Sequence, residues 1–238
     1  MIVRFALVTL LLAAVSLLVG TYVFVPPLLE QAAARSIEKE LRLENTPEVE
    51  LEKGSPQEVL AGRFSGGRVS MGAVDLGGAR AERVVVNLDP FDLNLPATML
   101  GRTIESEEQL SGTLRAEVSE KEVSRLARTQ EADVPVRDVE LEEGEMVVGS
   151  EVPVLGVEVP VSVVGDMVLR DGELAFVPRG VSALGEPVPE EFTNELFAGA
   201  DFSYPLGELP YGAEVTGVEV GDGRLVVSGA LQHIPLGQ

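Results

Sequence analysis

The chain has 238 residues, enough for one large or two small domains with a substantial hydrophobic core. It contains no cysteine, and its single histidine is His233, which excludes thiol chemistry, disulfides and metal sites built from cysteine and histidine. A total of 39 acidic residues against 18 basic ones argues against nucleic acid as a partner and against adsorption to an anionic bilayer.

The first predicted element is a membrane-spanning helix. No charged residue occurs between Phe5 and Val25, and at 1.5 Å per residue this run spans about 30 Å, the thickness of a bilayer core. The run is longer than the apolar region of a signal peptide and lacks a small-residue cleavage site, which favours an uncleaved signal anchor. We therefore expect an anchor at residues 1–27 and an extracytoplasmic domain at residues 28–238, in a single-pass protein of the cell membrane.

Three further segments predict helices. The first, around residues 30–42, carries apolar residues at successive i+4 positions, namely Leu29, Ala33, Ile37 and Leu41. The second begins at Ser119, where Glu122 completes the spacing of a capping box, and covers residues 119–129. The third runs from Pro189 to Gly199, with acidic residues in its first turn.

Most of the remaining chain predicts antiparallel strands. Three segments share one pattern of two apolar-alternating arms around an acidic residue and a glycine, which is typical of hairpins: VELEEGEMVV, VLRDGELAFV and VEVGDGRLVV. Between the first two lies EVPVLGVEVPVSVVGDMVL, which is long for one strand. Its prolines and glycines, Pro153, Gly156, Pro160 and Gly165, predict bulges or edges where a long sheet bends.

Three stretches together resemble the LmeA-like phospholipid-binding family of bacterial envelope proteins. They are SPQEVLAGRFSGGRVSMGAVDLGGARAERVVVNLDPFDL, GRTIESEEQLSGTLRAEVSEKEVSRL and LPYGAEVTGVEVGDGRLVVSG, and they cover most of the chain after the expected anchor. The short helix ending in Val59-Leu60-Ala61-Gly62, the strand from Gly112 to Ser119 and the Leu-Pro-x-Gly segment at Leu209 carry the resemblance. It implies phospholipid binding and a fold similar to the tubular lipid-binding proteins, with no catalytic motif.

The predicted fold class is therefore α+β, with a long, strongly curved antiparallel sheet wrapped around amphipathic helices and preceded by the transmembrane helix. Such a sheet leaves an apolar surface that acyl chains bind, because each buried methylene contributes about 0.8 kcal/mol. The expected ligand is phospholipid or another acyl-chain lipid, without a cofactor. The candidate lipid-binding residues are Ile37, Leu41, Val123, Leu126, Phe192, Leu196 and Phe197.

Catalysis is the weaker interpretation. A lone histidine near the C-terminus, His233, is more typical of a surface residue than of a general base. Asp89 and Asp92 flank Pro90 in the way of a turn, and Glu142 and Glu143 belong to a predicted hairpin turn. The sequence has neither a G-x-S-x-G elbow nor a dinucleotide-binding glycine motif before a helix.

Three hypotheses follow from the sequence. The leading one is a membrane-anchored lipid-binding module that holds or transfers phospholipid, or assists assembly of an envelope glycolipid. The second is a structural or scaffolding envelope domain with a fully packed core that binds a protein partner through its acidic surface. The third is a hydrolase with an unrecognised site.

Overall fold

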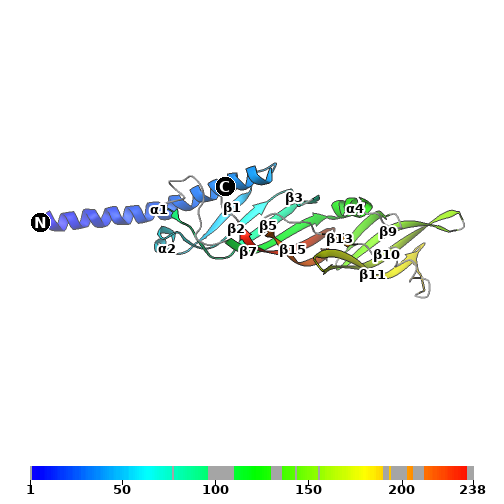
Figure 1. Ribbon diagram of the computed structural model, residues 1–238. Helices are drawn as coiled ribbons and strands as arrows, with labels where there is room; N and C mark the ends of the chain where they lie inside the picture. Colours follow the sequence, from blue (N-terminus) through cyan, green and yellow to red (C-terminus); the bar gives the residue numbers. More distant parts are fainter. Residues whose placement is uncertain are drawn as a thin grey trace. The chain divides into compact units, whose positions relative to one another are not determined.

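The chain folds into two compact units. The computed structural model describes residues 2–76, 78–95, 110–129, 136–142, 144–154, 156–189, 193, 203–205 and 212–234, with the backbone alone for residues 2–19, 21, 154, 205, 233 and 234 (Figure 1). The first unit comprises Met1–Gly72, Val85–Thr113 and Leu231–Gln238. The second comprises Ala73–Val84 and Leu114–Ala230.

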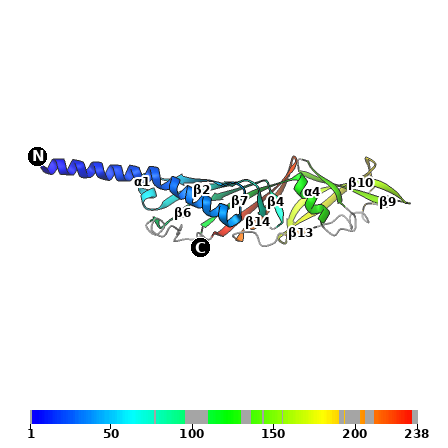
Figure 2. The ribbon, with the colours of Figure 1, turned by 90° about the horizontal axis from the view of Figure 1, so that it is seen from above.

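Helix α1 (Ile2–Leu41) is continuous through Pro26 and Pro27 (Figure 2). The expectation of an anchor helix followed by a separate amphipathic helix is wrong in this respect. Proline removes a backbone donor but holds φ near the helical value, so a helix can continue through it at a cost. Among the residues whose side chains are described, no helix has the length and hydropathy needed to cross a membrane.

The C-terminal part of α1 is joined to the first strand of the larger sheet. Glu30 accepts a hydrogen bond from the backbone N–H of Leu51 at 3.1 Å, and the Thr46 hydroxyl donates to Glu38 at 2.7 Å. Strand β1 (Glu48–Lys53) ends the strand order of its sheet, where backbone groups lack a strand partner on one side. The Glu30 carboxylate satisfies one of these edge groups.

The larger sheet has seven strands. Its order is β1, β2 (Arg63–Met71), β5 (Arg83–Leu88), β7 (Leu110–Ser119), β15 (Arg224–Ile234) and β14 (Glu214–Gly221), with β6 (Phe91–Asp92) paired to β2. A separate antiparallel pair consists of β3 (Val74–Leu76) and β4 (Ala79–Ala81). The short helix expected before Gly62 is confirmed as α2 (Pro56–Leu60), which begins with a capping box between Ser55 and Glu58.

The second sheet has six strands. Its order is β12 (Glu186–Pro187), β11 (Glu173–Ala183), β10 (Val157–Arg170), β9 (Glu145–Val154) and β8 (Val136–Glu142), with β13 (Ser203–Pro205) paired to β11. The expectation of one long sheet is therefore wrong, because the strands divide between two main sheets. The three predicted hairpins are confirmed as the antiparallel pairs β8–β9, β10–β11 and β14–β15.

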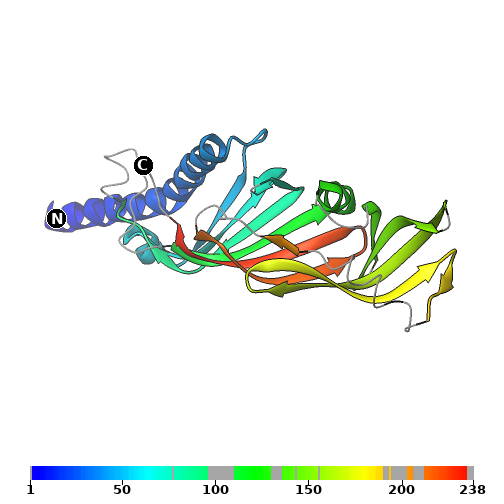
Figure 3. The same ribbon diagram turned by 45° about the vertical axis from the view of Figure 1, so that its right-hand side comes forward.

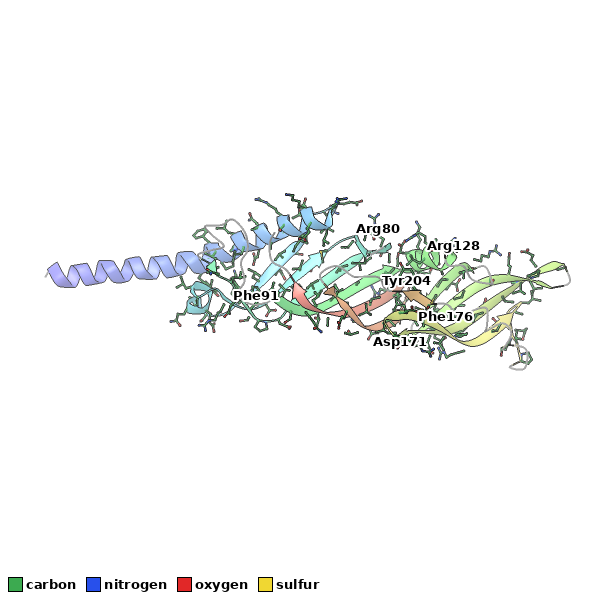
Figure 4. All side chains as sticks on the ribbon, viewed as in Figure 1. Arg80, Phe91, Arg128, Asp171, Phe176 and Tyr204 are labelled. Carbon is green, nitrogen blue, oxygen red and sulfur yellow. The ribbon has the colours of Figure 1, made fainter. Side chains whose placement is uncertain are left out.

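The segment from residue 151 to residue 169 is not one bent strand. The chain reverses at Gly156, which has φ of +83°, so that β9 and β10 pair as a fourth hairpin. The bulge expected at Gly165 is confirmed by a shift in register between Val164 and Gly165. At that position a side chain would collide with the ring of Phe176 at 2.7 Å, so the absence of a Cβ lets the phenylalanine pack against the strand (Figure 4).

Helix α4 (Glu120–Thr129) begins where the sequence predicts, and it packs against strand β8. The buried Ser124 hydroxyl donates to the carbonyl of Val139 at 3.1 Å and accepts from its N–H at 3.0 Å. Glu120 accepts from the N–H of Leu141 at 2.8 Å. These side chains satisfy backbone groups of β8, which is an edge strand of the six-stranded sheet.

The core of the second unit contains a row of valines that crosses the six-stranded sheet. The register aligns four buried side chains on neighbouring strands: Val139, Val148, Val163 and Val181. Phe176 and Met146 are fully buried in the same sheet. Cross-strand rows of this kind stabilise a sheet through contacts between branched side chains.

Within the second unit, backbone hydrogen bonds connect the two sheets. The N–H of Gly144 donates to the carbonyl of Val220 at 3.0 Å, and the N–H of Gly223 donates to that of Leu141 at 2.9 Å. The turn between β14 and β15 therefore lies beside the turn between β8 and β9. The N–H of Glu120, the first residue of α4, also donates to Gly223 at 3.1 Å.

Candidate functional site

The seven-stranded sheet presents an apolar face in the second unit. On β7, Leu114, Ala116 and Val118 are buried and alternate with polar neighbours, as expected for a sheet with one face covered. On β15, buried Leu225 and Gly229 lie on one face, and a Cβ at Gly229 would lie 3.7 Å from the Leu114 side chain. The apolar faces of β7 and β15 are therefore continuous.

This face becomes more exposed on the outermost strand. Val215, Val218 and Val220 of β14 pair with Gly229, Val227 and Leu225 of β15, respectively. A register shift between Val215 and Gly217 keeps the three β14 valines on one face despite their uneven spacing. We call the four half-buried side chains the valine face: Val215, Val218, Val220 and Val227.

The opposite face of these strands is charged. Arg115 of β7 lies 4.0 Å from Glu219 of β14, and Arg224 of β15 lies 3.8 Å from Glu117 of β7. All four positions alternate with the apolar ones along their strands. This face therefore carries the ion pairs, although Val226 of β15, which pairs with Glu219, is buried on it.

Strand β10 of the six-stranded sheet contacts β14. The second half of β10 contains half-buried apolar residues on both of its faces: Met167 and Leu169 on one, Val164 and Val168 on the other. The methionine side chain adapts to a mobile alkyl chain, and neither methionine nor valine offers a polar group that competes for hydrogen bonds. The chemistry of the valine face and of this part of β10 is suited to acyl chains and not to polar substrates.

The first unit contains a contrasting, closed apolar cluster. It joins α1 to the sheet through buried residues: Val25, Leu29, Phe64, Phe91, Leu93, Leu95 and Leu110. The rings of Phe64 and Phe91 stack with centroids 5.4 Å apart. Because every member is buried, this cluster is a core that holds α1 on the sheet.

Gly62 lets the chain approach this cluster closely. It has φ of +79°, a conformation that favours glycine, and its carbonyl accepts a hydrogen bond from the N–H of Leu93 at 2.8 Å. A Cβ at this position would collide with the carbonyl oxygen of Leu93. The glycine therefore fixes the path of the segment that contributes Leu93 and Leu95.

The predicted lipid-binding residues are distributed over both units. Ile37 and Leu41 are half-buried on α1 of the first unit, where Val25 and Leu29 make the core contacts instead. Val123 is buried on α4 of the second unit, and Leu126 is half-buried there. Phe192, Leu196 and Phe197, with most of the predicted helix from Pro189 to Gly199, lie outside the described residues. All seven remain predictions as lipid contacts.

Sequence reasoning did not select the valine face. The hairpin that carries it was predicted, and its alternation identifies which valines share a face. Alternation does not reveal whether a face is fully covered, because this depends on strands that are distant in the sequence. The sequence feature that could have identified this face is the β14–β15 hairpin itself, which is apolar and carries no group suited to catalysis.

Glu122 and Arg125 of α4 form a structural ion pair in the second unit. Glu122 receives two hydrogen bonds from Arg125, at 2.6 and 2.8 Å, and one from the backbone N–H of Arg80 at 2.9 Å. The bonds from Arg125 lower the pKa of Glu122 to about 2. Arg125 also donates to the carbonyl of Gly78 at 2.7 Å, so this pair attaches α4 to the β3–β4 segment.

Asp89 and Asp92, two of the acidic residues considered for catalysis, lie beside paired strands of the first unit. Asp89 accepts a hydrogen bond from the Ser111 hydroxyl at 2.7 Å, and its N–H donates to the Ser111 carbonyl at 3.0 Å. Asp92 pairs with Arg63 in the register of β6 and β2. Within the described part of the chain, no group of three or more acidic or histidine side chains is arranged to hold a metal ion.

Comparisons with known proteins agree with this chemistry. No curated protein and no solved structure matches the chain. A family model described as LmeA-like phospholipid-binding matches residues 21–230, which include most of both units. The chain therefore belongs to the LmeA-like phospholipid-binding family.

Proposed function

We propose that this protein is a non-catalytic protein of the cell envelope that binds a phospholipid or a related acyl-chain lipid along its valine face. The observation that carries the proposal is the family match over residues 21–230. The half-buried valines of β14 and β15 support it, because they form an apolar surface that the described residues do not fully cover. About ten methylenes placed on such a surface would contribute on the order of 8 kcal/mol.

The proposed fold is of the tubular lipid-binding type, in which antiparallel strands curve around helices. The antiparallel hairpins of both sheets support this proposal. So do the backbone hydrogen bonds from Gly144 to Val220 and from Gly223 to Leu141, which connect the sheets within the second unit. Lipid transfer, or a part in envelope glycolipid assembly, would follow from reversible binding.

The proposed membrane anchor consists of residues 1–27, with residues 28–238 outside the cytoplasm. Its support is the uncharged sequence between Phe5 and Val25. Val23, Phe24 and Leu28 of α1 are exposed, whereas Val25 and Leu29 are buried in the core cluster. The exposed side chains Val23, Phe24 and Leu28 form an apolar stripe, which a bilayer would cover at the point where α1 emerges from the membrane.

Binding of a fluorescent acyl probe to the purified, lipid-free chain in amphipol tests the lipid proposal. We expect saturable binding that unlabelled phospholipid displaces. A chain that folds but takes up no probe would contradict lipid binding and favour a scaffolding role. Carbonate washing of membranes tests the anchor separately: the chain should stay in the pellet, and recovery of a soluble form that starts near residue 25 would refute the anchor.

A further inference from the structure

Two hairpins of the second unit expose aliphatic side chains at one end of the six-stranded sheet. Val157, at the start of β10, is 65% exposed, and Leu184, after β11, is 75% exposed. The N–H of Leu184 donates to the carbonyl of Pro160 at 3.2 Å, so the β9–β10 and β11–β12 turns lie at the same end of adjacent strands (Figure 3). We call Val157 and Leu184 the apolar hairpin residues.

The backbone at Leu184 is unfavourable for leucine. Leu184 and Gly185 have φ of +56° and +84°, and Asp171 and Gly172 in the β10–β11 turn have φ of +51° and +81°. The two turns thus share the left-handed geometry of a tight hairpin, which aspartate adopts more readily than leucine. Asp171 lies at the other end of β10 (Figure 4). Leu184 adopts this unfavourable geometry and its side chain is exposed, which indicates that the side chain contacts another molecule and does not stabilise the fold.

The four turns that connect β8 to β12 also differ in amino-acid type between the two ends of the six-stranded sheet. At one end of the sheet the turns contain Gly144 and Asp171-Gly172, and at the other end they contain Gly156 and Leu184-Gly185. In the sequence Gly144 follows Glu143 and Gly156 follows Leu155, two residues that lie outside the described part of the chain. Acidic residues are usual beside glycine in such turns, and leucine is not. The difference therefore distinguishes one end of the sheet from the other in polarity.

We propose that the apolar hairpin residues insert into the surface of a phospholipid bilayer from which the protein collects its ligand, an inference that rests on the proposed function. Val157 and Leu184 present hydrocarbon without hydrogen-bonding groups, which matches an acyl layer. Exposed Glu158 and Glu186 follow them closely. These carboxylates limit insertion to the turns and oppose anionic headgroups, so a zwitterionic bilayer such as phosphatidylcholine is the partner.

The natural chain has no cysteine, which permits a direct test with single thiols. Leu184→Cys and Asp171→Cys, each labelled with a polarity-sensitive dye in the full chain held in amphipol, are mixed with phosphatidylcholine vesicles. The dye at residue 184 should move to an apolar environment, while the dye at residue 171 should not, and phosphatidylglycerol vesicles should give a smaller change. Equal responses at both positions, or none at residue 184, would overturn the proposal. A response at residue 184 that follows protein concentration without vesicles would also overturn it, in favour of a second copy of the chain.

A second experiment separates this inference from lipid binding itself. Leu184→Asp with Val157→Asp should slow phospholipid uptake from vesicles by about tenfold or more, because one buried aliphatic side chain contributes roughly that factor. Uptake of a water-soluble short-chain phospholipid should stay unchanged, and Asp171→Asn should alter neither. If uptake from vesicles is unchanged while the short-chain lipid still binds, the hairpin proposal fails. If the unmodified chain binds neither lipid, the proposed function itself fails and this inference fails with it.

Discussion

Placing a charge on the valine face should separate lipid binding from folding. Val218 is half-buried on β14, whereas Val163 is 6% exposed in the middle of the four-valine row. Val218→Asp removes about half of the burial energy of a valine, on the order of 1 kcal/mol, and leaves the new carboxylate within reach of water. Val163→Asp removes nearly all of that energy and buries an unpaired charge, at a cost of several kcal/mol.

These magnitudes predict different outcomes for the two variants. A domain of this size has a free energy of unfolding of roughly 5–15 kcal/mol, so Val218→Asp should fold and Val163→Asp should unfold or aggregate. The folded Val218→Asp protein should lose most of its acyl-probe binding, because the carboxylate would be desolvated beneath the chain. Val218→Ile, which keeps the surface apolar, is the matched control and should still bind.

Thermal unfolding and acyl-probe titration on the same preparations decide between the alternatives. The reasoning is refuted if Val218→Asp folds and binds the probe as well as the unmodified chain does, since the valine face would then not contact lipid. It is equally refuted if Val218→Asp unfolds as Val163→Asp does, because β14 would then be part of a closed core.

Three further predictions concern stability. Gly62→Ala should lower the free energy of unfolding by at least about 2 kcal/mol, because alanine is strained at φ of +79° and its Cβ would meet the Leu93 carbonyl. In the same urea titration the control Gly72→Ala should change this energy little, because no atom lies within 4 Å of the added Cβ. Ser124→Ala should cost about 2 kcal/mol by urea unfolding, since it leaves a buried N–H and a buried carbonyl of β8 without their partner; an unchanged midpoint would contradict this. Because the pKa of Glu122 is lowered, its pairing stabilises the fold above pH 4.5 and loses this effect as the pH falls to about 2. The melting temperature of Glu122→Gln should therefore be lower than that of the unmodified chain at pH 7, and the two should converge near pH 2. A difference in melting temperature that does not change with pH would show that the carboxylate charge is not responsible.

The local features of the fold could be predicted from the sequence. An acidic residue followed by glycine, with alternating arms on both sides, identified three hairpins, and the residues after Ser119 identified the start of α4. Turn chemistry and side-chain periodicity act over a few residues, so they are visible in a single chain. The turn at Gly156 was missed because leucine, which precedes it, is not a usual turn residue.

The arrangement of the strands could not be predicted in the same way. In the larger sheet β7 lies next to β15, more than 100 residues away in the sequence, and no local pattern specifies that pairing. The division into two sheets was missed for this reason. The sequence predicts that the anchor ends at residue 27, yet α1 continues through Pro26 and Pro27, because packing of Val25 and Leu29 in the core cluster offsets the lost hydrogen bonds.

The candidate site shows the same limit. The sequence indicated that an apolar surface binds the ligand, and the family match supports this class of ligand. Which apolar residues remain half-buried depends on how completely neighbouring strands cover them. Val218 and Val163 are both valines in alternating strands, and only the structure distinguishes the half-buried one from the buried one.

Mass spectrometry of an organic extract of the purified full-length chain tests lipid binding most directly. The account predicts a phospholipid, or a related acyl-chain lipid, in molar amounts comparable with the protein, and much less of it in an extract of the Val218→Asp variant prepared identically. An extract of the folded, unmodified chain that contains no more lipid than that variant does would contradict the account.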